Sequence, residues 1–319
     1  MRRTWSSSQH QRKSLAVITF AVIAATSLFV VPAHASRGGI EEPKNTFAVG
    51  LAFKFAGVDE LCSGILLSPT IVATAGHCYY SPKGDVGTDY IFTAPGQALD
   101  APLDPRVARP KIVKAYLDPT FNTKEFNNVN DIAFLQLDKA LPGSNFMKVA
   151  TMDEINSLGD VTVKGYGYGK VFETNFAYSV YPRMYSGTWK PFDSGTTTSN
   201  TLMFPSTTSV PCKGDSGGPI VATLPTGKQV LIGALSGASD VVDGCGTRAA
   251  DGNFYIRLTL AYPYLSLISA IYDPNKVPAV SPSPTANAKK VTIKCKKGTV
   301  IKKVTAVKPV CPKGYKPVK

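Results

Sequence analysis

Histidine is scarce in this chain of 319 residues: it contains three, and His77 is the only one after Ala35. A zinc site built on several imidazole ligands is therefore disfavoured, and we expect neither a metal nor a cofactor. Any acid–base chemistry that needs a histidine beyond Ala35 must use His77. The same part of the chain also lacks an apolar run long enough to cross a membrane.

Acidic residues are absent from the end of the chain. Residues 289–319 contain eleven lysines and no aspartate or glutamate, whereas residues 36–288 contain 20 basic and 22 acidic side chains. The excess of basic over acidic residues in the whole chain therefore comes from its two termini. We weigh attachment of this tail to an anionic surface polymer, a membrane or a substrate against a plain solubilising role. Its one aromatic residue, Tyr315, gives no sign of specific nucleic acid recognition.

The N-terminus has the pattern of an export signal. Four basic side chains precede an apolar run from Leu15 to Val31, and Ala33-His34-Ala35 follows with small residues at both outer positions. This pattern predicts a signal peptide over residues 1–35 and a secreted protein. The alternative is an uncleaved membrane anchor, which the shortness of the run and its polar residues disfavour.

Residues 36–272 have the pattern of an all-β domain, because short apolar or alternating runs recur between turn-forming residues. The expected strands are Phe47–Phe55, Ser63–Leu67, Ile71–Thr74, Ile112–Tyr116, Ile132–Leu137, Val161–Tyr166, Val230–Leu235 and Phe254–Leu258. Apolar spacing over Tyr262–Tyr272 predicts a closing helix. Strands of this kind build a sandwich or a barrel, and the domain is long enough for two small barrels.

Two further segments complete the expected organisation. Residues 273–288 are rich in proline and small side chains, which predicts a linker. In residues 289–319 Val, Ile and Thr alternate with Lys around two cysteines, which is typical of a small hairpin held by a disulfide. The chain has six cysteines, and an exported protein with an even number is expected to pair them, although sequence alone leaves the pairing open.

The most informative stretch is Pro211–Pro219, which reads Pro-Cys-Lys-Gly-Asp-Ser-Gly-Gly-Pro. Glycines beside Ser216 permit a tight turn that exposes the hydroxyl and directs neighbouring N–H groups toward one point. A serine nucleophile needs a base, and the base needs an orienting group. His77 is the candidate base. Asp131, at the start of an apolar run, is the candidate orienting acid, although an aspartate there also fits a simple turn.

These three segments, in the order His77, Asp131, Ser216, resemble the trypsin/chymotrypsin family of serine peptidases over roughly residues 36–272. The resemblance implies two packed antiparallel β-barrels with the active site between them and a C-terminal helix. The lysine-rich tail looks like short repeats at the ends of some bacterial secreted proteins, so we expect a secreted bacterial member with an added tail.

The resemblance also implies a role for each matching residue. Ser216 is expected to be the nucleophile, and His77 to take its proton and return it to the leaving amine. Asp131 is expected to hold one tautomer of His77, and the backbone N–H groups of Gly214 and Ser216 to form the oxyanion hole. The implied disulfides are Cys62–Cys78, Cys212–Cys245 and, as the remaining pair, Cys295–Cys311.

Asp215 is expected to pair with a newly freed N-terminal amine, as the matching aspartate does in the family. The family's mature chain normally begins Ile-Val-Gly-Gly, whereas this chain has Ser36-Arg37-Gly38-Gly39 at the corresponding place. Cleavage after Ala35 would free the amine of Ser36 and give an enzyme that is active on export. A second cut after Arg37 or Gly39 is the alternative.

The expected specificity pocket departs from that of trypsin. Val210 stands at the pocket floor, where a carboxylate would be needed to attract Lys or Arg. Ser236 is expected to offer its backbone carbonyl to the substrate, Gly237 and Ala238 to continue that wall, and Asn253 to stand where a glycine usually keeps the pocket open. We therefore expect an uncharged, small to medium residue before the cleaved bond.

The leading hypothesis is a secreted, monomeric serine endopeptidase that acts on protein or peptide substrates. One alternative is a non-catalytic binding protein on the same fold, although such relatives usually lose a triad residue. Another is an adhesion protein that is attached to a surface through the basic tail. The sequence leaves the natural substrate and the true N-terminus open.

Overall fold

The structure is a computed structural model, which describes residues 37–81, 83–99, 109–121, 129–142, 145–171, 177–193, 200–272, 291–298, 300–306, 311 and 314–318. The expected signal peptide, residues 1–35, and the expected linker, residues 273–288, lie outside the described residues. None of the helices in the described ranges is long and apolar enough to span a membrane.

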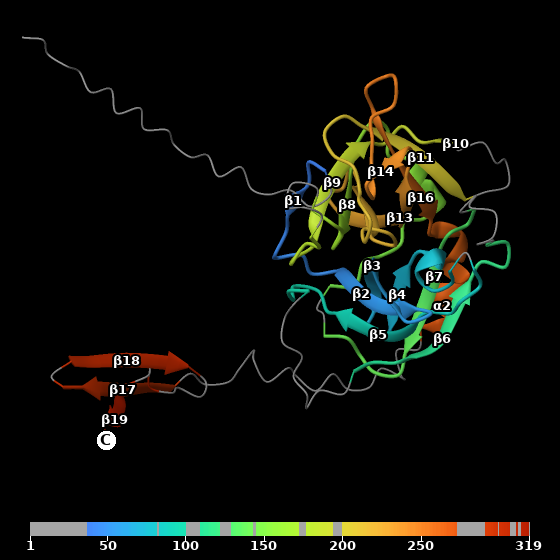
Figure 1. Ribbon diagram of the computed structural model, residues 1–319. Coiled ribbons are helices and arrows are strands. Elements are labelled where there is room, and N and C mark those ends of the chain that lie inside the picture. Colours follow the sequence, from blue (N-terminus) through green and yellow to red (C-terminus); the bar gives the residue numbers. More distant parts are fainter. Residues whose placement is uncertain are drawn as a thin grey trace, which may run out of the picture. The chain divides into compact units, whose positions relative to one another are not determined.

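The first half of the domain forms a curled sheet of six antiparallel strands in the order β5-β2-β3-β4-β7-β6 (Figure 1). The strands are β2 Ala48–Phe55, β3 Val58–Ser68, β4 Ile71–Thr74, β5 Thr88–Thr93, β6 Ile112–Leu117 and β7 Ala133–Leu137. The β2–β3 hairpin turns at Ala56 and Gly57, whose φ angles of 47° and 83° are those of a tight type I′ turn.

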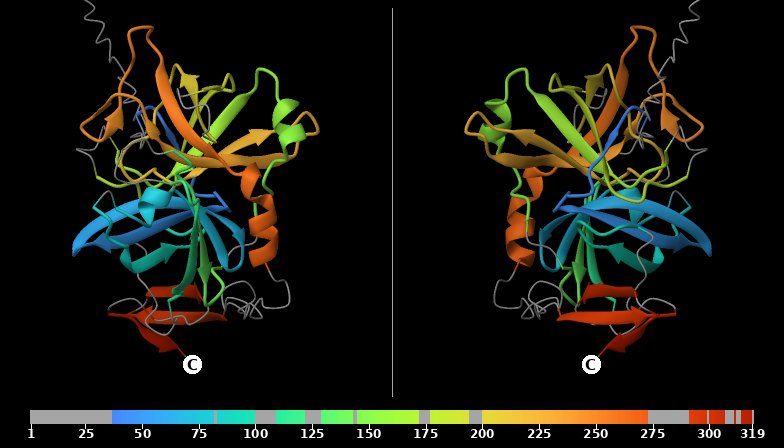
Figure 2. Two further views of the ribbon diagram at one scale, coloured as in Figure 1. Left: turned by 90° about the vertical axis from the view of Figure 1, so that its right-hand side faces the viewer. Right: turned by 90° about the vertical axis from the view of Figure 1, so that its left-hand side faces the viewer.

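The second half forms an antiparallel sheet of eight strands in the order β1-β9-β8-β12-β13-β16-β11-β10. The strands are β1 Ile40–Glu41, β8 Thr162–Gly167, β9 Arg183–Thr188, β10 Phe192–Asp193, β11 Thr201–Ser206, β12 Pro219–Thr223, β13 Gln229–Ala238 and β16 Phe254–Leu260. The sheet curls so that β9 and β11 approach each other (Figure 2). A separate two-stranded ribbon joins β14 Val241–Val242 to β15 Cys245–Gly246.

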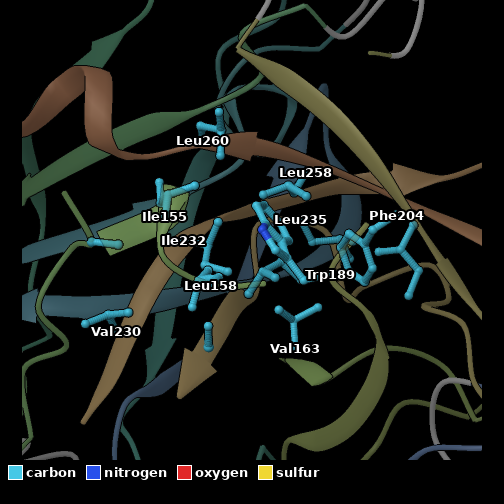
Figure 3. Close-up of a cluster of buried hydrophobic side chains, with 14 of the residues drawn as sticks. Ile155, Leu158, Val163, Trp189, Phe204, Val230, Ile232, Leu235, Leu258 and Leu260 are labelled. Atoms are coloured by element: carbon cyan, nitrogen blue, oxygen red, sulfur yellow. The ribbon is translucent and has the colours of Figure 1, made fainter. Parts of the chain in front are cut away.

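Each curled sheet encloses its own hydrophobic core. Figure 3 shows the core of the second sheet, where Trp189 and Phe204 lie among aliphatic side chains from β8, β13 and β16. A second cluster fills the first sheet, and a third contains residues of both sheets. This arrangement is the double β-barrel that the sequence predicted.

Two short helices complete the domain. The expected closing helix begins as a 3-10 turn at Tyr262–Tyr264 and continues as α2, Leu265–Ile271. It packs on the cluster shared by both sheets, where the rings of Tyr264 and Phe134 lie 5.5 Å apart. Helix α1, Met152–Asn156, begins with a capping box in which Thr151 and Glu154 bond to each other's backbone.

The tail forms a small antiparallel sheet of its own, in the order β18-β17-β19. Its strands are β17 Val291–Lys297, β18 Val300–Ala306 and β19 Lys316–Val318. The sequence predicted the β17–β18 hairpin but not the third strand.

Candidate active site

His77 and Asp131 are joined by two contacts. His77 lies in a 3-10 turn, Gly76–Cys78, that directly follows β4. Its Nδ1 lies 2.7 Å from Oδ2 of Asp131, and its backbone N–H donates to Oδ1 at 2.9 Å. The Asp131 side chain is fully buried, whereas that of His77 is 27% exposed. The Nδ1 edge of the imidazole is therefore held by Asp131, while part of the ring remains accessible to solvent.

A third donor to Asp131 comes from the other sheet. The Ser236 hydroxyl, on β13, donates to Oδ2 of Asp131 at 2.7 Å. Asn130, whose φ is 53°, precedes the carboxylate and is itself held by Thr201 and by the backbone N–H of Asn200. Asp131 is thus fixed by groups from both halves of the domain.

The contact with Asp131 determines the titration of His77. Burial by itself would lower the pKa of His77, because it disfavours the charged imidazolium. The negative charge of Asp131 and its hydrogen bond to the ring act in the opposite direction, and the net pKa of His77 lies above its ordinary value. A raised pKa favours the imidazolium that forms when His77 takes up a proton, which suits general acid–base chemistry.

Ser216 lies at the tip of a turn beside the histidine loop. Its backbone carbonyl accepts a hydrogen bond from the Ser63 N–H at 2.8 Å and lies 3.6 Å from Sγ of Cys78. Gly217 follows with φ of 80°, and a side chain there would collide with Thr74. Among the described contacts the Ser216 hydroxyl makes no hydrogen bond to His77. Such bonds are often long in unliganded enzymes.

The backbone of Gly214 and Ser216 provides two unused donors. Within the described part of the chain, neither N–H group donates to a protein acceptor, whereas Lys213, Asp215, Gly217 and the next glycine all do. Gly214 has φ of 100°, so a side chain there would be strained. A Cβ at Gly214 would also lie 2.9 Å from the Tyr178 ring. The turn can therefore present both donors to an external oxyanion.

Asp215 is fully buried next to this turn. Its carboxylate accepts hydrogen bonds from the backbone N–H groups of Cys212 and Gly169, each at 2.8 Å. Burial nevertheless raises the pKa of Asp215 to about 7, although these two bonds and the charge of Arg183 act to lower it. The expected partner, the amine of Ser36, lies outside the described residues.

The structure contains the three implied disulfides, Cys62–Cys78, Cys212–Cys245 and Cys295–Cys311. The first ties the His77 turn to β3, and the second ties the turn of Ser216 to β15. Cys62, His77 and Cys78 lie close together, but the two sulfurs are bonded to each other and Nδ1 faces Asp131. These three residues therefore do not present a free set of metal ligands.

Two residues expected in the specificity pocket, Val210 and Ala238, lie close to Gly246. Val210 is completely buried, and a Cβ at Gly246 would contact both the Val210 side chain and, at 2.8 Å, the Cβ of Ala238. Asn253 turns toward the loop, since its amide donates to Asp251 at 3.0 Å. Gly237 has open space around it. A surface pocket of about 770 Å³ borders β2 and β5 and includes none of these residues.

Sequence comparison identifies the fold family. Residues 36–265 match the trypsin family. The chain belongs to that family. The chain is 28% identical over 232 residues to the urokinase-type plasminogen activator of Gallus gallus. The aligned residues cover 66% of this chain and 51% of the relative. The venom peptide isomerase heavy chain of Agelenopsis aperta is 24% identical over 195 residues, which cover 57% of this chain and 79% of the relative.

Membership of the trypsin family places residues 36–265 among serine peptidase domains. The chain spans about half the length of the first relative, and the two relatives bear the names of different activities. The reaction of this chain must therefore be argued from its own residues. Both relatives are animal proteins, so the expected bacterial origin stays a prediction.

Sequence reasoning missed two contacts of this site. It gave Ser236 only a backbone role toward substrate, whereas the hydroxyl of Ser236 bonds to Asp131. It also overlooked Arg183, a buried residue that donates to the carbonyl of Gly39 at 2.7 Å and faces the charge of Asp215. A buried arginine in a strand has no local sequence signal, because its burial depends on partners far along the chain.

Proposed function

We propose that this protein is a secreted serine endopeptidase that cleaves peptide bonds through Ser216, His77 and Asp131. The observation that carries the proposal is the fully buried Asp131, which holds Nδ1 of His77 while the turn of Ser216 is bonded to the adjoining strand and lies against Cys78. Fixing Nδ1 as the donor leaves Nε2 free to accept a proton, which is the tautomer that a base needs.

The proposed reaction proceeds in two steps. The Ser216 oxygen attacks the substrate carbonyl as its proton passes to Nε2 of His77, and the resulting oxyanion accepts hydrogen bonds from the N–H groups of Gly214 and Ser216. His77 then gives the proton to the leaving amine, and an acyl-enzyme remains on Ser216. Water, deprotonated by His77, releases the acid product and restores the serine.

We propose a preference for uncharged residues of small to medium size before the cleaved bond. The side chains of Val210 and Ala238 both lie against Gly246, and we infer that they limit the room for a large substrate side chain. Asp240, Asp243 and Asp251 of the neighbouring loops are all exposed, and Asp251 bonds to Asn253 and Tyr255. The two buried carboxylates of this region, Asp131 and Asp215, already accept hydrogen bonds from Ser236 and Cys212. A buried substrate cation would therefore have no carboxylate to pair with.

We propose that export itself matures the enzyme. The Arg37 carbonyl accepts a hydrogen bond from Val210 at 3.0 Å, and Gly38 lies against the backbone of Thr208. Ser36 directly precedes Arg37 in the chain, so its Cα lies about 3.8 Å from that of Arg37. Cleavage after Ala35 would give Ser36 a charged amine. An ammonium beside Asp215 would offset the burial of its carboxylate. N-terminal sequencing of the exported protein tests this proposal, and a start at any other residue refutes it.

The experiment for the proposed activity is hydrolysis of a peptide library by the exported protein and by Ser216→Ala. We expect Ser216→Ala to fold normally and to lose hydrolysis by several orders of magnitude, since triad members act together. If the unaltered protein hydrolyses no peptide but still binds one, the non-catalytic alternative is correct.

A further inference from the structure

The tail sheet arranges its lysines on two different faces. Strand pairing places Lys294 directly opposite Lys303, and Lys296 directly opposite Lys316. Directly opposed residues project from the same side of a sheet, and residues two apart along a strand do the same. These four side chains therefore share one side, which we call the lysine face, and all four are exposed.

The opposite side of the sheet is partly covered by Cys311, Gly314 and Tyr315. Cys295 is completely buried there and is bonded to Cys311. Lys297 and Lys302 on that side are exposed as well, but both contact these residues. The ammonium group of Lys302 lies 5.3 Å from the centre of the Tyr315 ring, and the Lys297 side chain lies against Gly314. These cations therefore contribute to holding the tail together.

The lysine face has no such internal function. No acidic residue occurs in residues 289–319, and none of the four lysines makes an ion pair within the described ranges. Like charges placed directly opposite each other destabilise a sheet. Two opposed pairs side by side are thus unfavourable for folding and favourable for binding an anion that lies between them.

We propose that the lysine face binds a linear polyanion of phosphate groups, such as an anionic polymer of a cell surface. Neighbouring strands lie about 4.8 Å apart, and alternate residues along a strand about 7 Å apart. The four ammonium groups therefore cover an area that one phosphate cannot span and that several linked phosphates can. The inference concerns the tail alone and does not depend on peptidase activity.

The composition of the lysine face favours a polymer over a membrane or a nucleic acid base. Its two exposed aliphatic residues, Ile301 and Val318, stand in different rows of the sheet instead of forming one apolar patch. Faces that insert into bilayers usually carry large apolar or aromatic side chains together. No aromatic ring is available for base stacking, because Tyr315 lies beneath Lys302.

The test measures binding of the full-length protein to immobilised inorganic polyphosphate over a salt series. Four contacts predict that affinity falls about 50- to 150-fold between about 50 and 200 mM salt, using about 0.7–0.9 counterions released per contact. The double variant Lys294→Gln/Lys303→Gln should reduce this fall to about 10-fold and weaken binding at low salt. Peptide hydrolysis should not change.

The matched control is Lys297→Gln/Lys302→Gln, which removes the same charge from the opposite side of the sheet. It should bind polyphosphate within about threefold of the unaltered protein, and non-reducing peptide mapping should still find Cys295 bonded to Cys311. Equal losses in both double variants would show that net charge governs binding and would overturn the proposal. Tighter binding to vesicles of anionic lipid or to single-stranded DNA than to polyphosphate of equal charge would also overturn it.

Discussion

Replacement of Asp131 by asparagine tests the arrangement behind His77. The carboxylate accepts three hydrogen bonds, two from His77 and one from Ser236. Asparagine has the same shape, but an NH₂ group replaces one of the two oxygens. An NH₂ group only donates, so it can accept a hydrogen bond neither from Nδ1 nor from the Ser236 hydroxyl. The ring must then carry its proton on Nε2, where it cannot take the proton of Ser216.

The expected loss for Asp131→Asn follows from this change of tautomer. A histidine in the wrong tautomer reduces turnover by about 10⁴-fold, equivalent to about 5–6 kcal/mol of barrier. The pKa of His77 should also fall below its ordinary value, because burial remains and the charge of Asp131 is gone. The assay is kcat/KM on a small peptide ester from pH 5 to 9, together with a thermal melt.

Asp160→Asn is the matched control for that experiment. Asp160 is 71% exposed, and its ion pair within the described residues is with the surface residue Lys190, so this change should leave kcat/KM within about twofold. If Asp131→Asn retains more than a tenth of the original kcat/KM at pH 8, Asp131 does not orient the base and the reasoning is wrong.

Three further predictions follow from the same geometry. Hydrolysis by the unaltered protein should rise with pH as His77 loses its proton, with a midpoint above 6.5, and a flat profile from pH 5 to 9 would contradict this base. Gly214→Ala should reduce kcat about 10²- to 10³-fold through loss of an oxyanion donor, while Gly227→Ala, at φ of 81° in open space, should affect stability alone. Peptides with Lys or Arg before the cleaved bond should be poor substrates because Val210 is buried and uncharged, and a strong Arg preference in a peptide library would refute that pocket.

Much of the site could be predicted because its signals are local. Pro211–Pro219 contains the proposed nucleophile, the glycines and the two N–H groups proposed for the oxyanion hole within nine residues, so a single turn builds them. His77 is the only histidine of the domain, so the candidate base could be identified without weighing other histidines. The structure adds that Gly214 is required both by its positive φ and by the Tyr178 ring, which sequence alone did not indicate.

The unpredicted parts depend on distant partners or on weak patterns. The bond from Ser236 to Asp131 joins residues 105 positions apart, and only the packing of the two sheets brings them together. Strand β11 was missed because its apolar residues do not alternate regularly and it contains Pro205, which usually argues against a strand. It exists because β16 pairs with it along its whole length. Helix α1 did have a readable signal, the capping box of Thr151 and Glu154.

The most direct test of the central claim is covalent labelling of the exported protein by a fluorophosphonate, followed by intact-mass measurement and peptide mapping. Such a reagent reacts with a serine only when a neighbouring base activates it. The account predicts one label per molecule on Ser216, and no label in His77→Ala although that variant keeps its fold. A protein that hydrolyses peptides but remains unlabelled at Ser216, or that is labelled there equally well without His77, would contradict it.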